Sequence, residues 1–254
     1  MRSLFHSTVS SAPPTVAAVE APFPRIVGAE IAADFLGTRV GGDLYDSLRV
    51  SPERILFGLL DVAGRREANL DIIAAAQQTF RNFGTELFSR SDINESEAMT
   101  ELSLRINRVL IEASHGVHPC PAFIGCYHET LGTLCYANAG HTPGLLRDGS
   151  GITALASTGL PLGLFSHAPA DAPTIGLEKD AALLLVSRGV IECEGRADDC
   201  TEEFGLERVK QVFCSAPPSG AEALCAFVLS SVNKFEGKSR SHDDRTALAL
   251  VRTA

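Results

Sequence analysis

The chain has 254 residues and a formal net charge of −9, from 22 Lys and Arg against 31 Asp and Glu. Hydrophobic residues make up 45% and charged residues 21%, which is ordinary for a globular protein with a sizeable core. The acidic balance argues against non-specific binding to nucleic acid or to anionic membranes, because such binding requires a basic surface. No run approaches the roughly 18 consecutive apolar residues of a membrane span.

The first 24 residues differ in composition from the rest of the chain. Residues 1–24 are rich in Ser, Ala, Pro, Thr and Val, and this composition predicts a flexible N-terminal arm. The arm has no continuous apolar segment, so a secretory signal is not expected. Residues 25–254 contain no linker-like stretch and no internal repeat, and they are predicted to form one domain.

The seven cysteines form no C-x-x-C pair. This favours free thiols in a reducing cytoplasm over a disulfide framework. Four of them lie among apolar neighbours and are predicted to be small core residues. These four are Cys126, Cys135, Cys214 and Cys225.

The predicted elements come as blocks of strands and blocks of helices. Residues 54–60 are an apolar run typical of a buried strand, and apolar stripes predict helices over 67–88 and 95–113. Further strands are predicted at 122–127, 133–139, 144–147, 181–187 and 246–251, and further helices at about 203–214 and 219–235. Blocks of this kind, rather than strict βαβ alternation, predict an α+β sandwich with antiparallel sheets between helix layers.

Three short segments place acidic residues beside glycine or at the ends of apolar strands. They are Val40-Gly-Gly-Asp-Leu-Tyr-Asp46, Leu59-Leu-Asp-Val-Ala-Gly64 and His242-Asp-Asp-Arg-Thr246. Mg²⁺ and Mn²⁺ prefer carboxylate oxygens, and neighbouring glycines allow close backbone approach. Each segment alone is more typical of a turn or a helix cap, so no single one identifies a metal site.

Seven motifs follow one another in a fixed order between about residues 28 and 251. They are Val40-Gly-Gly-Asp-Leu-Tyr-Asp46, Asp61-Val-Ala-Gly64, Tyr136-Ala-Asn-Ala-Gly-His-Thr-Pro143, Gly159-Leu-Pro-Leu-Gly163, Gly189-Val-Ile-Glu192, Glu203-Phe-Gly-Leu-Glu-Arg208 and Asp243-Asp-Arg-Thr246. In this order they resemble the bacterial metal-dependent Ser/Thr protein phosphatases of the PPM class. The most similar branch acts in sporulation and in partner-switching control of sigma factors.

The resemblance implies a fold and a reaction. The implied fold is a four-layer α/β/β/α sandwich, in which two mostly antiparallel sheets are flanked by helices and hold a two-metal site at one end. The implied reaction is hydrolysis of phosphoserine or phosphothreonine by water that two Mn²⁺ or Mg²⁺ ions activate. The implied partner is a phosphorylated regulatory protein, with an anti-sigma-factor antagonist as the example by analogy.

The resemblance also implies site residues. The implied ligands are the bridging carboxylate of Asp61, the carbonyl of Val62, and the carboxylates of Asp43 and Asp243, with Asp61 and Asp43 as the catalytic pair. Asp46 and Asp244 are implied to support these ligands through hydrogen bonds.

Two positions depart from the family pattern. Arg188 stands where the resemblance implies a metal-binding Asp, and an Arg cannot bind a metal. One pair of unit charges ~4 Å apart is worth ~4 kcal/mol at an effective dielectric of ~20, so the first ion is expected to be weakened or excluded. Arg65 and Arg66 replace a His-Gly step at a predicted helix start, where they could bind a phosphate or be solvated surface charges.

Three functional hypotheses remain from the sequence. The first is an active phosphoprotein phosphatase with an altered metal site. The second is a catalytically impaired pseudophosphatase that binds a regulatory phosphoprotein, with Arg188 in the place of the first ion. The third is an unrelated metal-binding or structural protein.

Three further features are predicted to be structural. The segment His115-Gly-Val-His-Pro-Cys120, with Cys126, does not have the spacing of a structural zinc site and is predicted to be a loop without metal. His141 is predicted to bond to the backbone within its turn. The acidic stretch 193–203 is predicted to be a solvated loop, and a weaker candidate for partner recognition.

Overall fold

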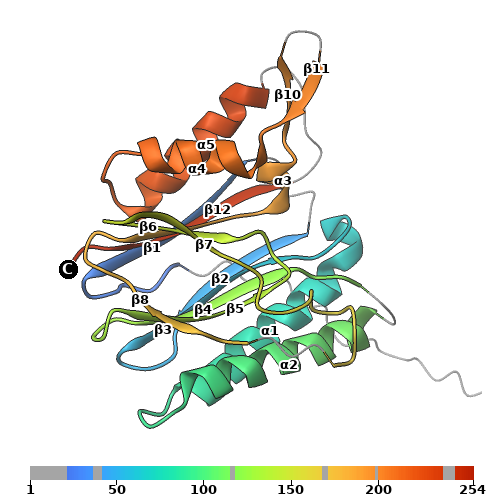
Figure 1. Ribbon diagram of the computed structural model, residues 1–254. Helices are drawn as coiled ribbons and strands as arrows, with labels where there is room; N and C mark the ends of the chain where they lie inside the picture. Colours follow the sequence, from blue (N-terminus) through green and yellow to red (C-terminus); the bar gives the residue numbers. More distant parts are fainter. Residues whose placement is uncertain (1–21, 37–41, 115–117, 168–170, 198–199, 237–243) are drawn as a thin grey trace, which may run out of the picture.

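The molecule consists of four layers, shown in the computed structural model of Figure 1. Residues 22–36, 42–114, 118–167, 171–197, 200–236 and 244–254 are described. A pair of helices covers each outer face of two central antiparallel sheets, so the predicted α/β/β/α sandwich is confirmed.

The first sheet has the strand order β1-β12-β9-β6-β7 within the described residues. Its strands are β1 (Ala29–Leu36), β12 (Arg245–Arg252), β9 (Ala182–Val186), β6 (Gly144–Asp148) and β7 (Gly151–Leu155). Helices α4 (Gly205–Ser215) and α5 (Ala221–Glu236) pack on its outer face. Strand β12, the last strand along the chain, therefore lies inside the first sheet and pairs with β1 on one side and β9 on the other.

The second sheet has the strand order β2-β3-β4-β5-β8 within the same residues. Its strands are β2 (Asp43–Arg49), β3 (Arg54–Asp61), β4 (Ala122–His128), β5 (Thr133–Ala139) and β8 (Thr174–Gly176). Helices α1 (Leu70–Phe88) and α2 (Glu95–Ser114) cover its outer face. Three short elements complete the described chain: the 3-10 helix η1 (Arg66–Asn69), helix α3 (Arg188–Ile191) and the hairpin of β10 (Glu194–Ala197) with β11 (Cys200–Glu203).

Apolar side chains fill all three spaces between the layers. Every residue of β3 is buried, because β3 is covered by α1 on one face and by the first sheet on the other. Phe57 and Leu59 face the other sheet, whereas Leu56 and Leu60 face the helices. This two-sided burial explains why β3 appears in the sequence as a continuous apolar run rather than as an alternating one.

Several predicted elements need correction. The predicted helix 67–88 is divided into η1 and α1, and strands β1, β2, β7 and β8 were not predicted as strands. The stretch 193–203, predicted to be a loop, contains the β10–β11 hairpin. Cys214 is exposed rather than buried, because Val209 and Phe213 form the inward face of α4.

The remaining sequence predictions concern the arm and the thiols. Residues 1–21 of the predicted arm lie outside the described residues; within its last three, Phe23 stacks on Tyr45 with 6.1 Å between ring centroids. The division into an arm and one domain stays a prediction. Cys126, Cys135 and Cys225 are buried, as predicted, and these three, with Cys120, Cys193 and Cys214, are free thiols.

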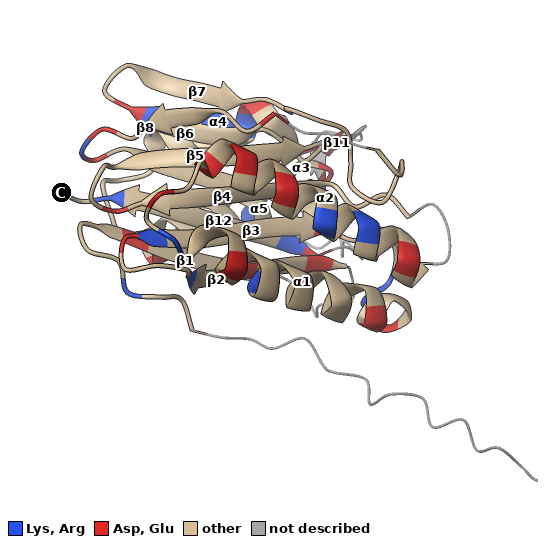
Figure 2. Ribbon diagram, turned by 90° about the horizontal axis from the view of Figure 1, so that it is seen from below, with Lys and Arg blue, Asp and Glu red and all other residues tan. Residues whose placement is uncertain are grey.

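The helices that cover the second sheet do not carry a surface of uniformly positive or uniformly negative charge. Figure 2 shows basic and acidic residues interspersed along α1 and α2. None of the described helices is both long enough and apolar enough to cross a membrane.

The packing of Gly125 against Phe57 provides a test of the inter-sheet core. A Cβ atom at Gly125 would lie 2.5 Å from Cζ of Phe57, a fully buried ring. We expect Gly125→Ala to lower the free energy of unfolding by about 1–3 kcal/mol, because the ring has no free space into which it can move. Gly176→Ala is the control, since nothing lies within 4 Å of the added atom, and it should change stability by less than about 0.5 kcal/mol. Urea denaturation measures both, and equal effects would contradict the packing.

Candidate functional site

Asp43 and Asp61 form a carboxylate pair at one end of the second sheet. Asp43 is the first residue of β2, Asp61 is the last of β3, and the two are direct partners in the antiparallel ladder. Side chains of directly opposite residues project from the same face of a sheet. Alternation along the strands places both on the face that Tyr45 and Leu59 share, toward the first sheet.

The carboxylate pair is electrostatically costly. The pKa of Asp43 is raised from 3.8 to about 8, chiefly by burial and in smaller part by repulsion from Asp61 and Asp244, against the opposing effect of hydrogen bonds from Thr246 and Ser187. The Thr246 hydroxyl donates to Oδ2 of Asp43 across 2.6 Å. A group of acids held together in this way requires positive charge nearby if all its members are to ionise.

Ser187 joins the ends of β9 and β12 at the site. Its backbone N–H donates to the Thr246 carbonyl at 2.9 Å, and its hydroxyl donates to the Asp244 carbonyl at 3.2 Å. The hydroxyl oxygen also accepts the Thr246 N–H at 3.0 Å. These bonds join the end of β9 to the start of β12, and the bond from the Thr246 hydroxyl links that start to Asp43 of the second sheet. Asp243, the predicted ligand one residue earlier, lies outside the described residues.

The turn after Asp61 is held by close backbone contacts. The Val62 N–H donates to the Gly42 carbonyl at 3.3 Å, and a Cβ atom at Gly42 would lie 1.7 Å from the Val62 carbonyl oxygen. Only glycine permits this approach. The next carbonyl, that of Ala63, accepts hydrogen bonds from Asn69 Nδ2 at 2.8 Å and from His118 Nε2 at 2.7 Å.

Arg188 reaches the carboxylate pair from the first sheet. It is the first residue of α3, directly after Ser187, and its Nε lies 3.5 Å from Oδ2 of Asp61. The same Nε lies 3.8 Å from Oε2 of Glu192, one helical turn later. The side chain of Arg188 is half exposed, whereas that of Asp61 is 13% exposed. The position where the sequence predicts a missing ligand thus carries a cation that pairs with Asp61.

Asp46 has a different location from the one predicted. It lies on the opposite face of β2 from Asp43 and points toward α1. Its carboxylate binds Arg81 through two bonds of 2.6 Å and accepts a bond from Gln77 at 3.0 Å. Because Asp46 follows Asp43 by three positions, an odd number, strand alternation directs the two side chains to opposite faces. Asp46 therefore anchors α1 to β2 and does not support the carboxylate pair from behind.

The two predicted phosphate-binding arginines differ from each other. Arg66 is partly buried, and its Nη1 donates to the backbone carbonyl of Asp43 at 2.9 Å. Arg65 precedes η1 and is exposed. Arg66 thus contributes to the position of Asp43, and Arg65 is the one whose side chain faces solvent.

The donor set fits one divalent cation better than two. Asp43, Asp61 and the Val62 carbonyl supply oxygen atoms of the kind that Mn²⁺ and Mg²⁺ prefer. The guanidinium group of Arg188, at the position where the resemblance implies a carboxylate, has its Nε 3.5 Å from Oδ2 of Asp61. Within the described residues, which exclude Asp243, no group of three or more His, Cys, Asp or Glu side chains is placed to hold a metal ion.

Three residues near the acids received no role from the sequence. Thr246 belongs to the last motif and Ser187 lies two residues before the Gly189 motif, so the sequence indicates that both are near the site. Their hydrogen bonds cannot be predicted from the sequence. Cys120 is fully buried, and burial together with the charges of Asp61 and Asp43 raises the pKa of its thiol. No sequence signal links Cys120 to the acids, because their proximity depends on the pairing of β3 with β4, where the Asp61 N–H donates to the Pro121 carbonyl at 2.8 Å.

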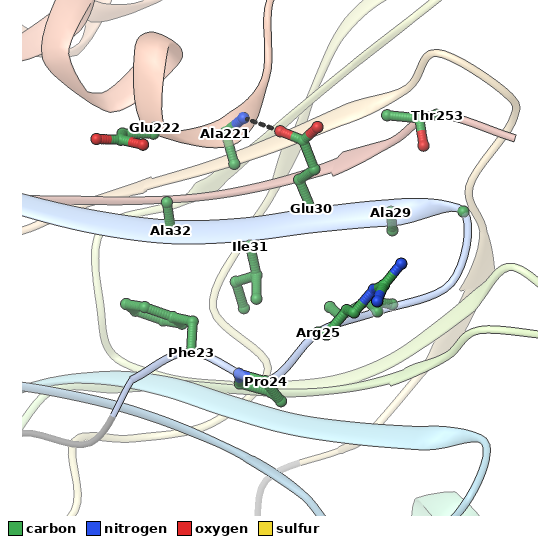
Figure 3. Close-up of a pocket in the computed structure, with 12 residues that line it drawn as sticks. Phe23, Pro24, Arg25, Ala29, Glu30, Ile31, Ala32, Ala221, Glu222 and Thr253 are labelled. Carbon is green, nitrogen blue, oxygen red and sulfur yellow. Dashed lines mark hydrogen bonds between the residues drawn. The ribbon is translucent and has the colours of Figure 1, made fainter.

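A cavity of about 450 Å³ lies away from these residues, between 23–25, β1 and the start of α5 (Figure 3). Glu30 points across it and accepts a hydrogen bond from the Ala221 N–H at 3.1 Å. None of its lining residues belongs to the predicted site. The bond from Ala221 gives Glu30 a structural role at the N-terminus of α5.

Comparisons with known proteins agree with this geometry. Residues 51–253 match the family described as stage II sporulation protein E (SpoIIE). A curated relative, phosphoserine phosphatase RsbP of Bacillus subtilis (strain 168), is 25% identical over 156 residues, which are 61% of this chain and 38% of the relative. The chain thus spans well under half the length of that relative.

Two solved structures share the fold. The SiaA-PP2C domain of Pseudomonas aeruginosa has a TM-score of 0.73 and 15% identity, over 88% of this chain and 85% of that one. The structure of RsbX in complex with magnesium has a TM-score of 0.61 and 14% identity, over 88% of this chain and 94% of that one.

His141 provides a pH test of the turn beside the site. Its Nδ1 donates to the Thr142 carbonyl at 3.1 Å, which confirms the predicted backbone bond, and its buried Nε2 has no hydrogen-bond partner among the described residues. Burial lowers the pKa of His141 from 6.5 to about 4. The unfolded chain therefore binds the proton first, so stability is fully present above pH 6.5 and is lost as the pH falls toward 4.

We expect the free energy of unfolding to fall by up to about 2 kcal/mol more between pH 7 and 5 in the wild type than in His141→Gln. The measurement is urea denaturation at each pH. His167→Gln, at an exposed histidine, is the control and should keep the wild-type dependence. An unchanged pH dependence in His141→Gln would show that His141 titrates normally in the folded chain.

Proposed function

The chain belongs to the family of stage II sporulation protein E (SpoIIE), and from this membership we propose that it is a metal-dependent phosphoprotein phosphatase. The observation that carries the proposal is the carboxylate pair of Asp43 and Asp61, held against the start of β12 by Thr246 and Ser187. This arrangement joins three of the sequence motifs at one end of the two sheets.

The proposed cofactor is Mn²⁺ or Mg²⁺, bound by Asp43, Asp61, the Val62 carbonyl and Asp243. A divalent cation at such a site lowers the pKa of bound water and neutralises charge on a phosphoryl group. The magnesium complex of RsbX, which has the same fold, supports this choice of ions.

The chain's own residues position the acids for this task. Thr246 donates to one oxygen of Asp43 and so orients its carboxylate. Arg66 holds the Asp43 carbonyl, and the contact between Gly42 and Val62 fixes the turn after Asp61. Arg65, which is exposed at the start of η1, is the proposed phosphate contact, because a guanidinium group matches phosphate geometry in two-point hydrogen bonds.

The proposed substrate is a phosphoserine or phosphothreonine of a regulatory protein in partner-switching signalling, for which an anti-sigma-factor antagonist is the example. The relative RsbP is named a phosphoserine phosphatase, which supports hydrolysis. The alternative, a pseudophosphatase that binds without turnover, gains no support from the comparisons over hydrolysis. A cytoplasmic location is part of the proposal, since a cytoplasmic substrate would place the chain there.

The test is hydrolysis of a phosphoserine peptide with added Mn²⁺. We expect turnover in the wild type and a loss of more than about 100-fold in Asp61→Asn, because even changes behind metal ligands cost about 10- to 100-fold. Asp92→Asn, at a carboxylate that is 70% exposed and pairs with Arg90, is the matched control and should retain full activity. A wild-type chain without Mn²⁺-dependent turnover would refute the proposed function.

A further inference from the structure

We propose that the guanidinium group of Arg188 takes the place of one of the two cations, so that the chain binds a single divalent ion on the Asp43 side of Asp61. The proposal rests on the proposed function for the presence of a metal site. The proposal goes beyond that function because it assigns the number of bound ions and names Arg188 as the residue that determines this number.

The position of Arg188 is fixed by the backbone. Ser187, the preceding residue, forms three hydrogen bonds with Asp244 and Thr246 at the start of β12. The chain at Arg188 therefore cannot move away from the carboxylates without breaking the link between β9 and β12. From this fixed point the side chain extends to Asp61, with 3.5 Å between Nε and Oδ2.

The ion pair of Arg188 with Asp61 brings positive charge to the carboxylates but is not the kind of contact that stabilises the fold. Its separations, 3.5 Å to Asp61 and 3.8 Å to Glu192, are long, and the Arg188 side chain is 51% exposed. Pairs of this kind contribute little to folding. Asp61, in contrast, is buried beside Asp43 and gains from any nearby positive charge.

Arg188 and a second ion exclude each other. A bridging carboxylate offers one oxygen to each of two ions, and here Oδ2 of Asp61 faces the guanidinium group. An ion on that side would approach a fixed positive charge, and Arg188 offers it no carboxylate oxygen. On the Asp43 side, the described bonds run from Thr246 to Oδ2 of Asp43 and from Arg66 to its backbone carbonyl. Because each carboxylate oxygen has two lone pairs, these bonds still leave the Asp43 carboxylate able to bind a cation.

The test is the number of Mn²⁺ ions bound by the full chain, from calorimetric titration and native mass spectrometry. We expect about one ion in the wild type and about two in Arg188→Asp, which restores the carboxylate. Arg188→Ala should bind about one ion, about tenfold or more tightly than the wild type, because the repulsion is removed but no ligand is added.

Arg90→Asp is the matched control for the change of two charge units. Arg90 lies just beyond the C-terminal end of α1, pairs with Asp92 and is 72% exposed. The start of α1 follows the Asp61 turn, so the length of the helix separates Arg90 from the carboxylate pair. This variant should bind about one ion with an affinity within about twofold of the wild type, since charges at that distance are screened.

Two ions in the wild type, or a single ion in a folded Arg188→Asp, would overturn the proposal. If Arg188→Asp fails to fold, an Arg188→Ala chain that binds Mn²⁺ no more tightly than the wild type would overturn it instead. Circular dichroism establishes folding. Hydrolysis is measured separately. A wild type that binds one ion without turnover would support the role of Arg188 and refute the proposed function. A wild type that binds two ions with turnover would support the proposed function and refute the role of Arg188.

Discussion

The cost of placing neighbouring carboxylates in a desolvated site is the constraint on which the rest of the site depends. Asp43 and Asp61 are direct partners across β2 and β3, and Asp244 approaches from the other sheet. Burial alone disfavours their charged forms, and each neighbour adds to this effect. Hydrogen-bond donors, chiefly the Thr246 hydroxyl, and the positive charge of Arg188 offset part of this cost. An arrangement so unfavourable by itself is typical of a site that binds cations.

The two-sheet architecture is what brings these acids together. Asp43 and Asp61 come from the ends of two strands in the second sheet, whereas Asp244 and Thr246 come from the start of β12 in the first. The large apolar core between the sheets holds these ends at a fixed separation. Ser187 then connects β9 to β12 at the same end. A close-packed core of this kind leaves little freedom for the ends of its strands, so the site is positioned by packing far from it.

Arg188 places a positive charge beside Asp61 at this end of the sandwich. The backbone bonds of Ser187 involve no property of the side chain that follows. The same fold can therefore present a carboxylate or a guanidinium group at position 188. The charge beside Asp61 then differs by two units, a difference that the fold tolerates because the side chain is half exposed. Function in such a fold is determined by a few side chains at the strand ends rather than by the fold itself.

The sequence by itself determined the layer architecture, most of the long helices and buried strands, and the acidic segments of the site. Strong apolar periodicity and ordered motifs carry that information locally, as in β3 and α2. Only the tertiary structure decided that Asp46 faces α1, that Arg188 pairs with Asp61, and that Thr246 bonds to Asp43. Strand β1, with its weak alternation, also became recognisable only through its pairing with β12. These features depend on register and on contacts between distant segments, which local patterns do not encode.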